Sequence, residues 1–138
     1  MKRFSLICVL LSSAVCALAS STYSESRLND LASSLTKLSS AVDGAVRYLN
    51  PPPSMLLEND QFLRLSTAGN PSVLVPFSNL KLRVKRLGSE TAILVCRPDA
   101  DVALLEDATC TARMDKHRWK DQPQSACEFT LDLTEVCK

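Results

Sequence analysis

Histidine and glycine are scarce in this chain of 138 residues, which has one histidine and three glycines. A metal site built on histidines is therefore excluded, and a catalytic triad or dyad would depend on His117 alone, with no nucleophile motif near it. The glycines stand at 44, 69 and 88, too far apart for a phosphate-binding loop. The patterns Gly-x-Ser-x-Gly, His-Glu-x-x-His and Cys-x-x-Cys do not occur. We therefore expect no enzymatic activity, no metal and no cofactor.

The acidic stretch at 99–107 is the remaining candidate for cation binding. Asp99, Asp101, Glu106 and Asp107 could offer oxygen ligands, but the residue order of a calcium-binding EF-hand loop is missing. Val102 to Leu105 are instead apolar and indicate a buried strand. We expect solvated turns here.

The first nineteen residues have the pattern of a secretory signal peptide. A positive start at Lys2 and Arg3 is followed by an apolar stretch, and Ala17-Leu18-Ala19 offers a small-x-small cleavage site. Cleavage would leave residues 20–138 as a single domain. A periplasmic or secreted location follows. The brief signal and the lack of an Asn-x-Ser/Thr glycosylation acceptor favour a bacterial source.

Two membrane-anchored alternatives fit the same segment less well. A transmembrane helix needs about 20 largely apolar residues, whereas residues 4–19 form a shorter stretch that contains serines. A lipid anchor on Cys16 would require leucine three residues earlier and a small residue directly before it, where Ser13 and Val15 stand. We expect no transmembrane span.

Loss of the leader changes the cysteine count and the charge. Four of the six cysteines remain, at Cys96, Cys110, Cys127 and Cys137, and an even number in an oxidising compartment predicts two disulfides. Of three possible connectivities, short loops favour Cys96 with Cys110 and Cys127 with Cys137. Sixteen basic residues less Lys2 and Arg3 leave fourteen against fifteen acidic ones, so specific binding to nucleic acid is not expected.

A long amphipathic helix is expected from Tyr23 to Leu49. Thr22 and Glu25 have the spacing of a capping box, and Pro51 follows the segment. An unbroken apolar stripe with 3-4 spacing comprises Leu28, Leu31, Leu35, Leu38, Val42, Ala45 and Leu49. This helix would be longer than the strands, so its stripe must be covered by a second helix, by a partner or by another copy of the chain.

The second helix is expected in the segment Met55 to Leu65, capped by Ser54 and stopped by Gly69. A helical turn or loop follows at 72–77. Strands come afterwards. The strongest pair is 80–85 with 91–96 around Gly88-Ser89, and further strands are expected at 102–105, 110–114 and 129–133.

Helices followed by strands predict an α+β fold. The two helices would pack on an antiparallel sheet of four or five strands, with the second sheet face partly solvated and disulfides in the C-terminal half.

Two groups of basic residues form the candidate interaction surface. The first projects from one side of the strand at 80–85, and the second crowds around a tryptophan in an expected loop. Their members are Lys81, Arg83, Lys85, Arg113, Lys116, Arg118, Trp119 and Lys120. A patch shared by both groups could bind an anionic surface, with Trp119 as anchor. In the simpler alternative, the strand face is solvated and the tryptophan is buried in the core.

Three functions remain open. The leading hypothesis is a non-enzymatic protein-interaction module of inhibitor, immunity or envelope-adaptor type, monomeric or dimeric through the N-terminal helix. A small-ligand carrier would need a cavity between helix and sheet. A small hydrolase would need two carboxylates converging in a cleft.

Overall fold

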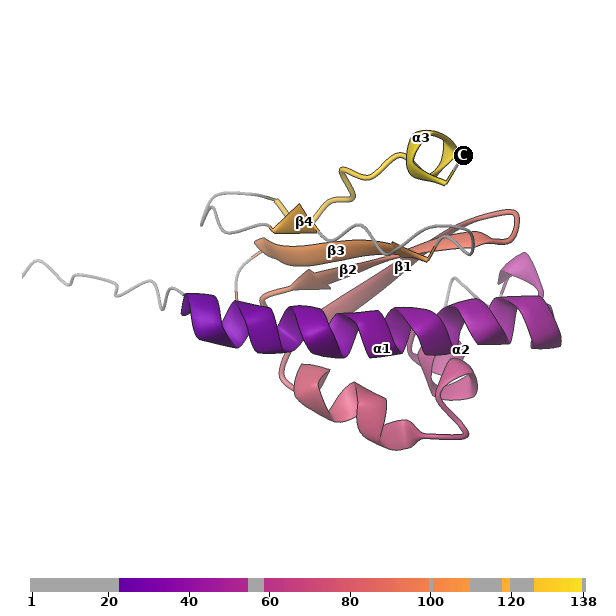
Figure 1. Ribbon diagram of the computed structural model, residues 1–138, viewed down its shortest axis with the longest axis horizontal. Coiled ribbons are helices and arrows are strands. Elements are labelled where there is room, and N and C mark those ends of the chain that lie inside the picture. Colours follow the sequence, from indigo (N-terminus) through magenta and orange to yellow (C-terminus); the bar gives the residue numbers. More distant parts are fainter. Residues whose placement is uncertain (1–22, 55–58, 100, 110–117, 120–125, 138) are drawn as a thin grey trace, which may run out of the picture.

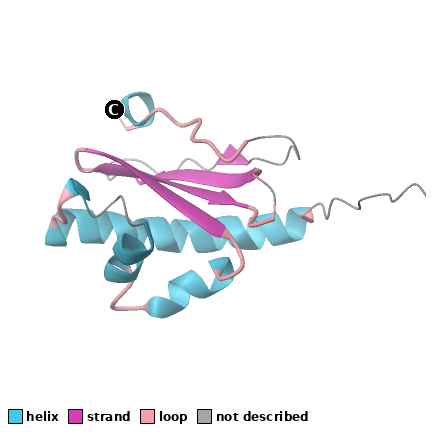
Figure 2. Cartoon of the chain, turned by 180° about the vertical axis from the view of Figure 1, so that it is seen from behind, coloured by secondary structure: helices cyan, strands magenta, loops and turns pink. Residues whose placement is uncertain are grey.

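Helices and an antiparallel sheet form an α+β architecture in the computed structural model, which describes residues 23–54, 59–99, 101–109, 118–119 and 126–137. α1 (Glu25–Leu49) lies along one face of the sheet, with α2 (Asn59–Ser66) and the 3-10 helix η2 (Pro71–Phe77) beneath it (Figure 1). The C-terminal segment, residues 126–137, includes α3 (Leu133–Val136) and lies on the other side of the sheet. The view from behind shows the same layers (Figure 2).

α1 begins and ends at residues suited to those places. Ser24 is the N-cap, and its hydroxyl accepts the N–H of Arg27 at 3.3 Å. Asn50 ends the helix in the left-handed region with φ of 40°, and Pro51 follows. The predicted helix is confirmed, but its expected capping-box start is corrected because Ser24 caps it; Thr22 lies outside the described residues.

The apolar stripe of α1 is covered from within the chain along most of its length. Six of its seven residues are buried, and only Leu49 is exposed. Part of the cover comes from Phe62 and Leu63 of α2 and from Phe77 of η2, which belong to the same core cluster. The expected second helix is therefore present, although residues 55–58 lie outside the described part. The helical turn predicted at 72–77 is also confirmed by η2.

The sheet has three full strands rather than the four or five expected. β1 (Lys81–Leu87), β2 (Glu90–Cys96) and β3 (Ala103–Thr109) pair antiparallel in that order. A pairing of two residues, β4 (Arg118–Trp119), is added along β3. The strand predicted at 102–105 is confirmed by β3, and the one predicted at 110–114 lies outside the described residues.

The strand predicted at 129–133 is wrong. Its alternating pattern of apolar residues is real, because Leu131 and Leu133 are buried and Thr130 and Asp132 are exposed. Asp132 ends the extended stretch, since its side chain accepts the N–H of Thr134 at 2.9 Å and starts α3. The segment therefore lies across the sheet without joining it.

A two-residue turn fixes the hairpin of β1 and β2. Leu87 pairs with Glu90, which leaves Gly88 and Ser89 as the loop. Gly88 has φ of 60°, and no positive φ occurs at Ser89, as in a type II′ turn with glycine first. This hairpin confirms the sequence prediction.

Both faces of the central strands are buried. Ile93, Val95 and Leu105 face α1, and Leu82 and Val84 of the edge strand β1 pack against the same core cluster. On the opposite face, Ala92, Leu94, Cys96, Ala103 and Ala108 are covered by residues of the C-terminal segment. The expectation of a partly solvated second face is therefore corrected for β2 and β3, and it holds only along β1.

The described disulfide joins Cys96 of β2 to Cys127, with a Cα–Cα distance of 5.7 Å. The favoured pairing of Cys96 with Cys110 and of Cys127 with Cys137 is therefore wrong. Loop length favoured neighbours in sequence, but the C-terminal segment places Cys127 over Cys96, and both are buried. Cys137 is also disulfide-bonded, and Cys110 lies outside the described residues.

Candidate interaction surface

Three cations project from one side of β1. Lys81, Arg83 and Lys85 are exposed, while Leu82 and Val84 between them are partly buried against the core. The alternation follows from strand geometry, in which successive side chains point to opposite faces. We call Lys81, Arg83 and Lys85 the basic row. The sequence predicted this part of the surface.

The members of the basic row differ in their surroundings. The guanidinium of Arg83 donates from Nη1 to the carbonyl of Cys127 at 2.5 Å and lies 5.9 Å from the ring centroid of Phe129. It thus ties β1 to the C-terminal segment. The described ion pairs are Arg47 with Asp43 and Arg97 with Asp99, so within that set no carboxylate neutralises the row.

Arg86 of the same strand has a structural role. Its guanidinium donates to the carbonyl of Pro51 at 2.6 Å, to Oδ1 of Asn50 at 3.3 Å and to the carbonyl of Gly88 at 2.7 Å. These bonds join β1 to the residues that directly follow α1 and to the hairpin turn. Arg86 is therefore separate from the basic row.

Two members of the second predicted group, Arg118 and Trp119, lie at the edge of the sheet opposite the basic row. Arg118 and Trp119 form β4, which is next to β3, whereas β1 is at the other edge. In register, Arg118 pairs with Glu106 and Trp119 pairs with Leu105. Cys127 and the residues that follow it cover β2 and β3 between these edges.

Three basic residues of the second group lie outside the described residues, namely Arg113, Lys116 and Lys120, as does His117. A single patch that includes both groups therefore stays a prediction.

The outer edge of β1 was not anticipated from the sequence. Because a two-residue loop makes Leu87 and Glu90 a hydrogen-bonded pair and such pairs alternate, Leu82, Val84 and Arg86 direct their backbone groups away from β2. The N–H of Val84 donates to the side-chain Oδ1 of Asn59, at the start of α2, at 3.3 Å. A lone asparagine before a helix carries no signal that would have revealed this contact.

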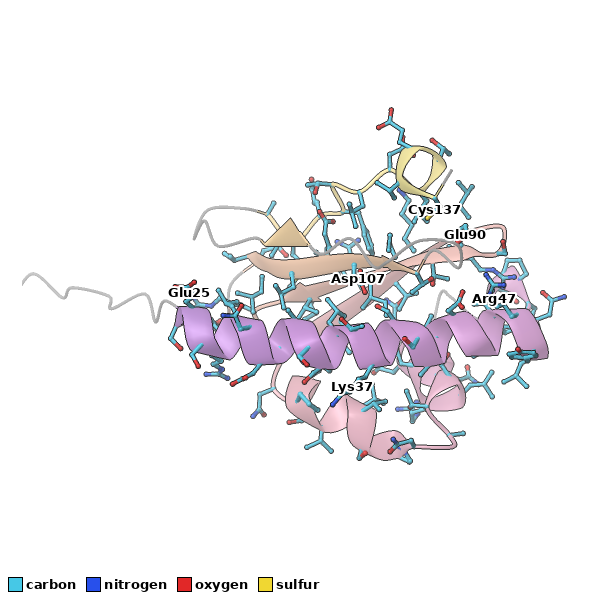
Figure 3. All side chains as sticks on the ribbon, in the orientation of Figure 1. Glu25, Lys37, Arg47, Glu90, Asp107 and Cys137 are labelled. Carbon is cyan, nitrogen blue, oxygen red and sulfur yellow. A yellow bond between two sulfur atoms is a disulfide. The ribbon has the colours of Figure 1, made fainter. Side chains whose placement is uncertain are left out.

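Two buried carboxylates occupy adjacent positions of β3. Glu106 faces the C-terminal segment, where it accepts the N–H of Thr130 at 2.9 Å. Asp107 lies between the sheet and α1 (Figure 3). Their side chains are on opposite faces of the strand and do not converge on a common point.

The acidic stretch at 99–107 was the sequence candidate for cation binding. Among the residues that the structure describes, no group of three or more histidine, cysteine or acidic side chains is arranged to hold a metal ion. Asp99 is bound to Arg97 at 2.6 Å and raises the pKa of that guanidinium above its ordinary value through their hydrogen bond. Arg97 also lies 6.0 Å from the ring centroid of Tyr23, next to the start of α1.

No described helix is long and apolar enough to cross a membrane. Comparison with known proteins gives no match to a family model, to a curated protein or to a solved structure.

Proposed function

We propose that the chain is a secreted or periplasmic, non-enzymatic interaction module that binds an acidic protein partner through the basic row. The supporting observation is a line of three exposed cations on an edge strand that no described ion pair neutralises. Exposed charges of one sign attract a partner of the opposite sign and speed its association. The mature chain has a net charge near zero, so the local row and not bulk charge would direct binding.

The internal cover of α1 makes the alternative of a homodimer through this helix less favourable. Leu35, Leu38 and Val42 are fully buried within the chain. A coiled-coil partner would have to displace α2 and η2 from the stripe. Buried residues of α1 and of the sheet also belong to one core cluster, at the helix–sheet interface where the carrier alternative requires a cavity. We therefore favour a monomeric module.

Binding to polyglutamate tests the proposal. The mature chain should bind this polyanion at low salt, and Lys81→Ser/Lys85→Ser should weaken binding at least tenfold. Arg83 is left intact because it also holds the C-terminal segment. The matched control is Lys37→Ser/Arg64→Ser, which removes two exposed cations from α1 and α2. Equal weakening in both variants, or no binding by the parent chain, would refute a role for the basic row.

A further inference from the structure

The outer edge of β1 has backbone groups available for pairing with another strand. The outward N–H and C=O groups belong to Leu82, Val84 and Arg86. Among the described residues, the one hydrogen bond between these groups and another element is donated by the N–H of Val84 to Asn59. An edge strand with unpaired groups is a template for strand addition.

Asn59 occupies the place that a partner strand would take. Its side-chain carbonyl accepts the N–H of Val84 as a backbone carbonyl of an added strand would. The contact is long, at 3.3 Å, and it serves one outward donor of the three. Asn59 thus caps the middle of the edge with a side-chain carbonyl, and a backbone carbonyl of an incoming strand can take its place as acceptor of the Val84 N–H.

The side chains of β1 specify the chemistry of the incoming strand. A strand added in register would place alternate side chains beside Lys81, Arg83 and Lys85 on one face. On the other face, its side chains would lie beside Leu82 and Val84, which adjoin the core. An alternation of acidic and apolar residues satisfies both faces.

A second copy of this chain is a poor occupant. Antiparallel pairing of two β1 strands centred on Val84 would place Arg83 of each copy opposite Lys85 of the other. Like charges directly opposite each other destabilise a strand pair. The same cations protect the edge from self-association while attracting an acidic strand.

We propose that the outer edge of β1 accepts a β-strand of the partner protein with alternating acidic and apolar residues, which displaces Asn59 from Val84. This mode of binding rests on the proposed function, because it assumes an acidic partner for the basic row. It adds that recognition is carried by the backbone as well as by charge.

Labelled peptides provide the test. The parent probe is the acetylated and amidated peptide Thr-Glu-Val-Glu-Val-Glu-Thr, and two derivatives carry N-methyl groups at the odd or at the even positions. Strand addition requires the N–H groups of one set only, so one derivative should bind at least tenfold more weakly than the parent by fluorescence anisotropy while the other binds similarly. Addition of the parent should also slow amide exchange at Leu82 and Arg86.

The outcomes separate the two proposals. If the parent and both methylated peptides bind equally, or if polyglutamate binds while the parent peptide does not, strand addition is refuted and charge recognition stands. If neither polyglutamate nor any peptide binds, both proposals fail. Asn59→Ala, which removes the cap, should bind the parent peptide severalfold more tightly, and Asn79→Ala in the loop before β1 serves as the control. Weaker binding by Asn59→Ala would contradict the displacement step.

Discussion

The carboxylate of Glu106 accepts the backbone N–H of Thr130, with an Oε2–N distance of 2.9 Å. The same carboxylate accepts the Thr130 hydroxyl and, at 3.4 Å, the N–H of Leu131. One buried side chain therefore satisfies backbone donors that a neighbouring strand would otherwise bind. This contact and the Cys96–Cys127 disulfide hold the C-terminal segment on the sheet.

Glu106→Gln should lower the free energy of unfolding by about 1–3 kcal/mol, because an amide cannot accept all of these bonds through charged oxygens. Urea denaturation of the mature chain measures the loss. Glu128→Gln is the matched control, since Glu128 is exposed and the charge change is the same. Equal stability of the two variants would show that Glu106 does not hold the segment.

The double substitution Cys96→Ala/Cys127→Ala should lower stability by about 4 kcal/mol in the chain-entropy model for a loop of this length, with a sequence separation of 31. Thermal unfolding under non-reducing conditions checks the loss. Peptide mapping without reduction should recover one fragment pair that joins Cys96 to Cys127. Recovery of Cys96 joined to any other cysteine would contradict the described topology.

Two glycine substitutions should have opposite signs. Gly88→Ala should cost about 1–2 kcal/mol, because Gly88 has φ of 60° in the hairpin turn. Gly44→Ala should stabilise α1 by about 1 kcal/mol, since a Cβ there meets nothing within 4 Å and alanine has the higher helix propensity. Denaturant midpoints of the two variants test the pair. A stabilising Gly88→Ala would rule out the assigned turn.

The stripe of α1 should divide into a buried part and an exposed end. Leu38 is fully buried, and Leu38→Ala should cost about 2–5 kcal/mol. Leu49 is 57% exposed, and Leu49→Ala should change stability by less than about 0.5 kcal/mol. Chemical denaturation and light scattering should be measured on both. A large loss at Leu49, accompanied by a concentration-dependent mass of the parent chain, would instead indicate a dimer through this helix.

The elements with local signals were predictable from the sequence. The 3-4 spacing and Pro51 identified α1, and alternation around Gly88 identified the hairpin. Alternation at 129–133 correctly indicated which side chains are buried but not their backbone partner. An extended segment that lies across a sheet has the same period as a strand within it. The pattern therefore could not show that the N–H groups of Thr130 and Leu131 donate to the Glu106 side chain and not to a neighbouring strand.

The disulfide and the edge of β1 depend on contacts that are distant in sequence. Loop length could not reveal that Cys127 lies over Cys96, because this follows from the path of the C-terminal segment. The basic row was identified from alternation within one strand. The hydrogen bond from Val84 to Asn59 joins residues with a sequence separation of 25, and no local sequence pattern predicts it.

The burial of β2 between α1 and the segment at 126–137 has a consequence for the order of folding. Leu131, Leu133 and Val136 complete the hydrophobic layer over Ala92 and Ala108, which are distant from them in sequence. Non-local contacts of this kind form only after a long loop has closed, so one side of the central strand faces water until the segment at 126–137 docks. We expect this docking to be a late step in folding.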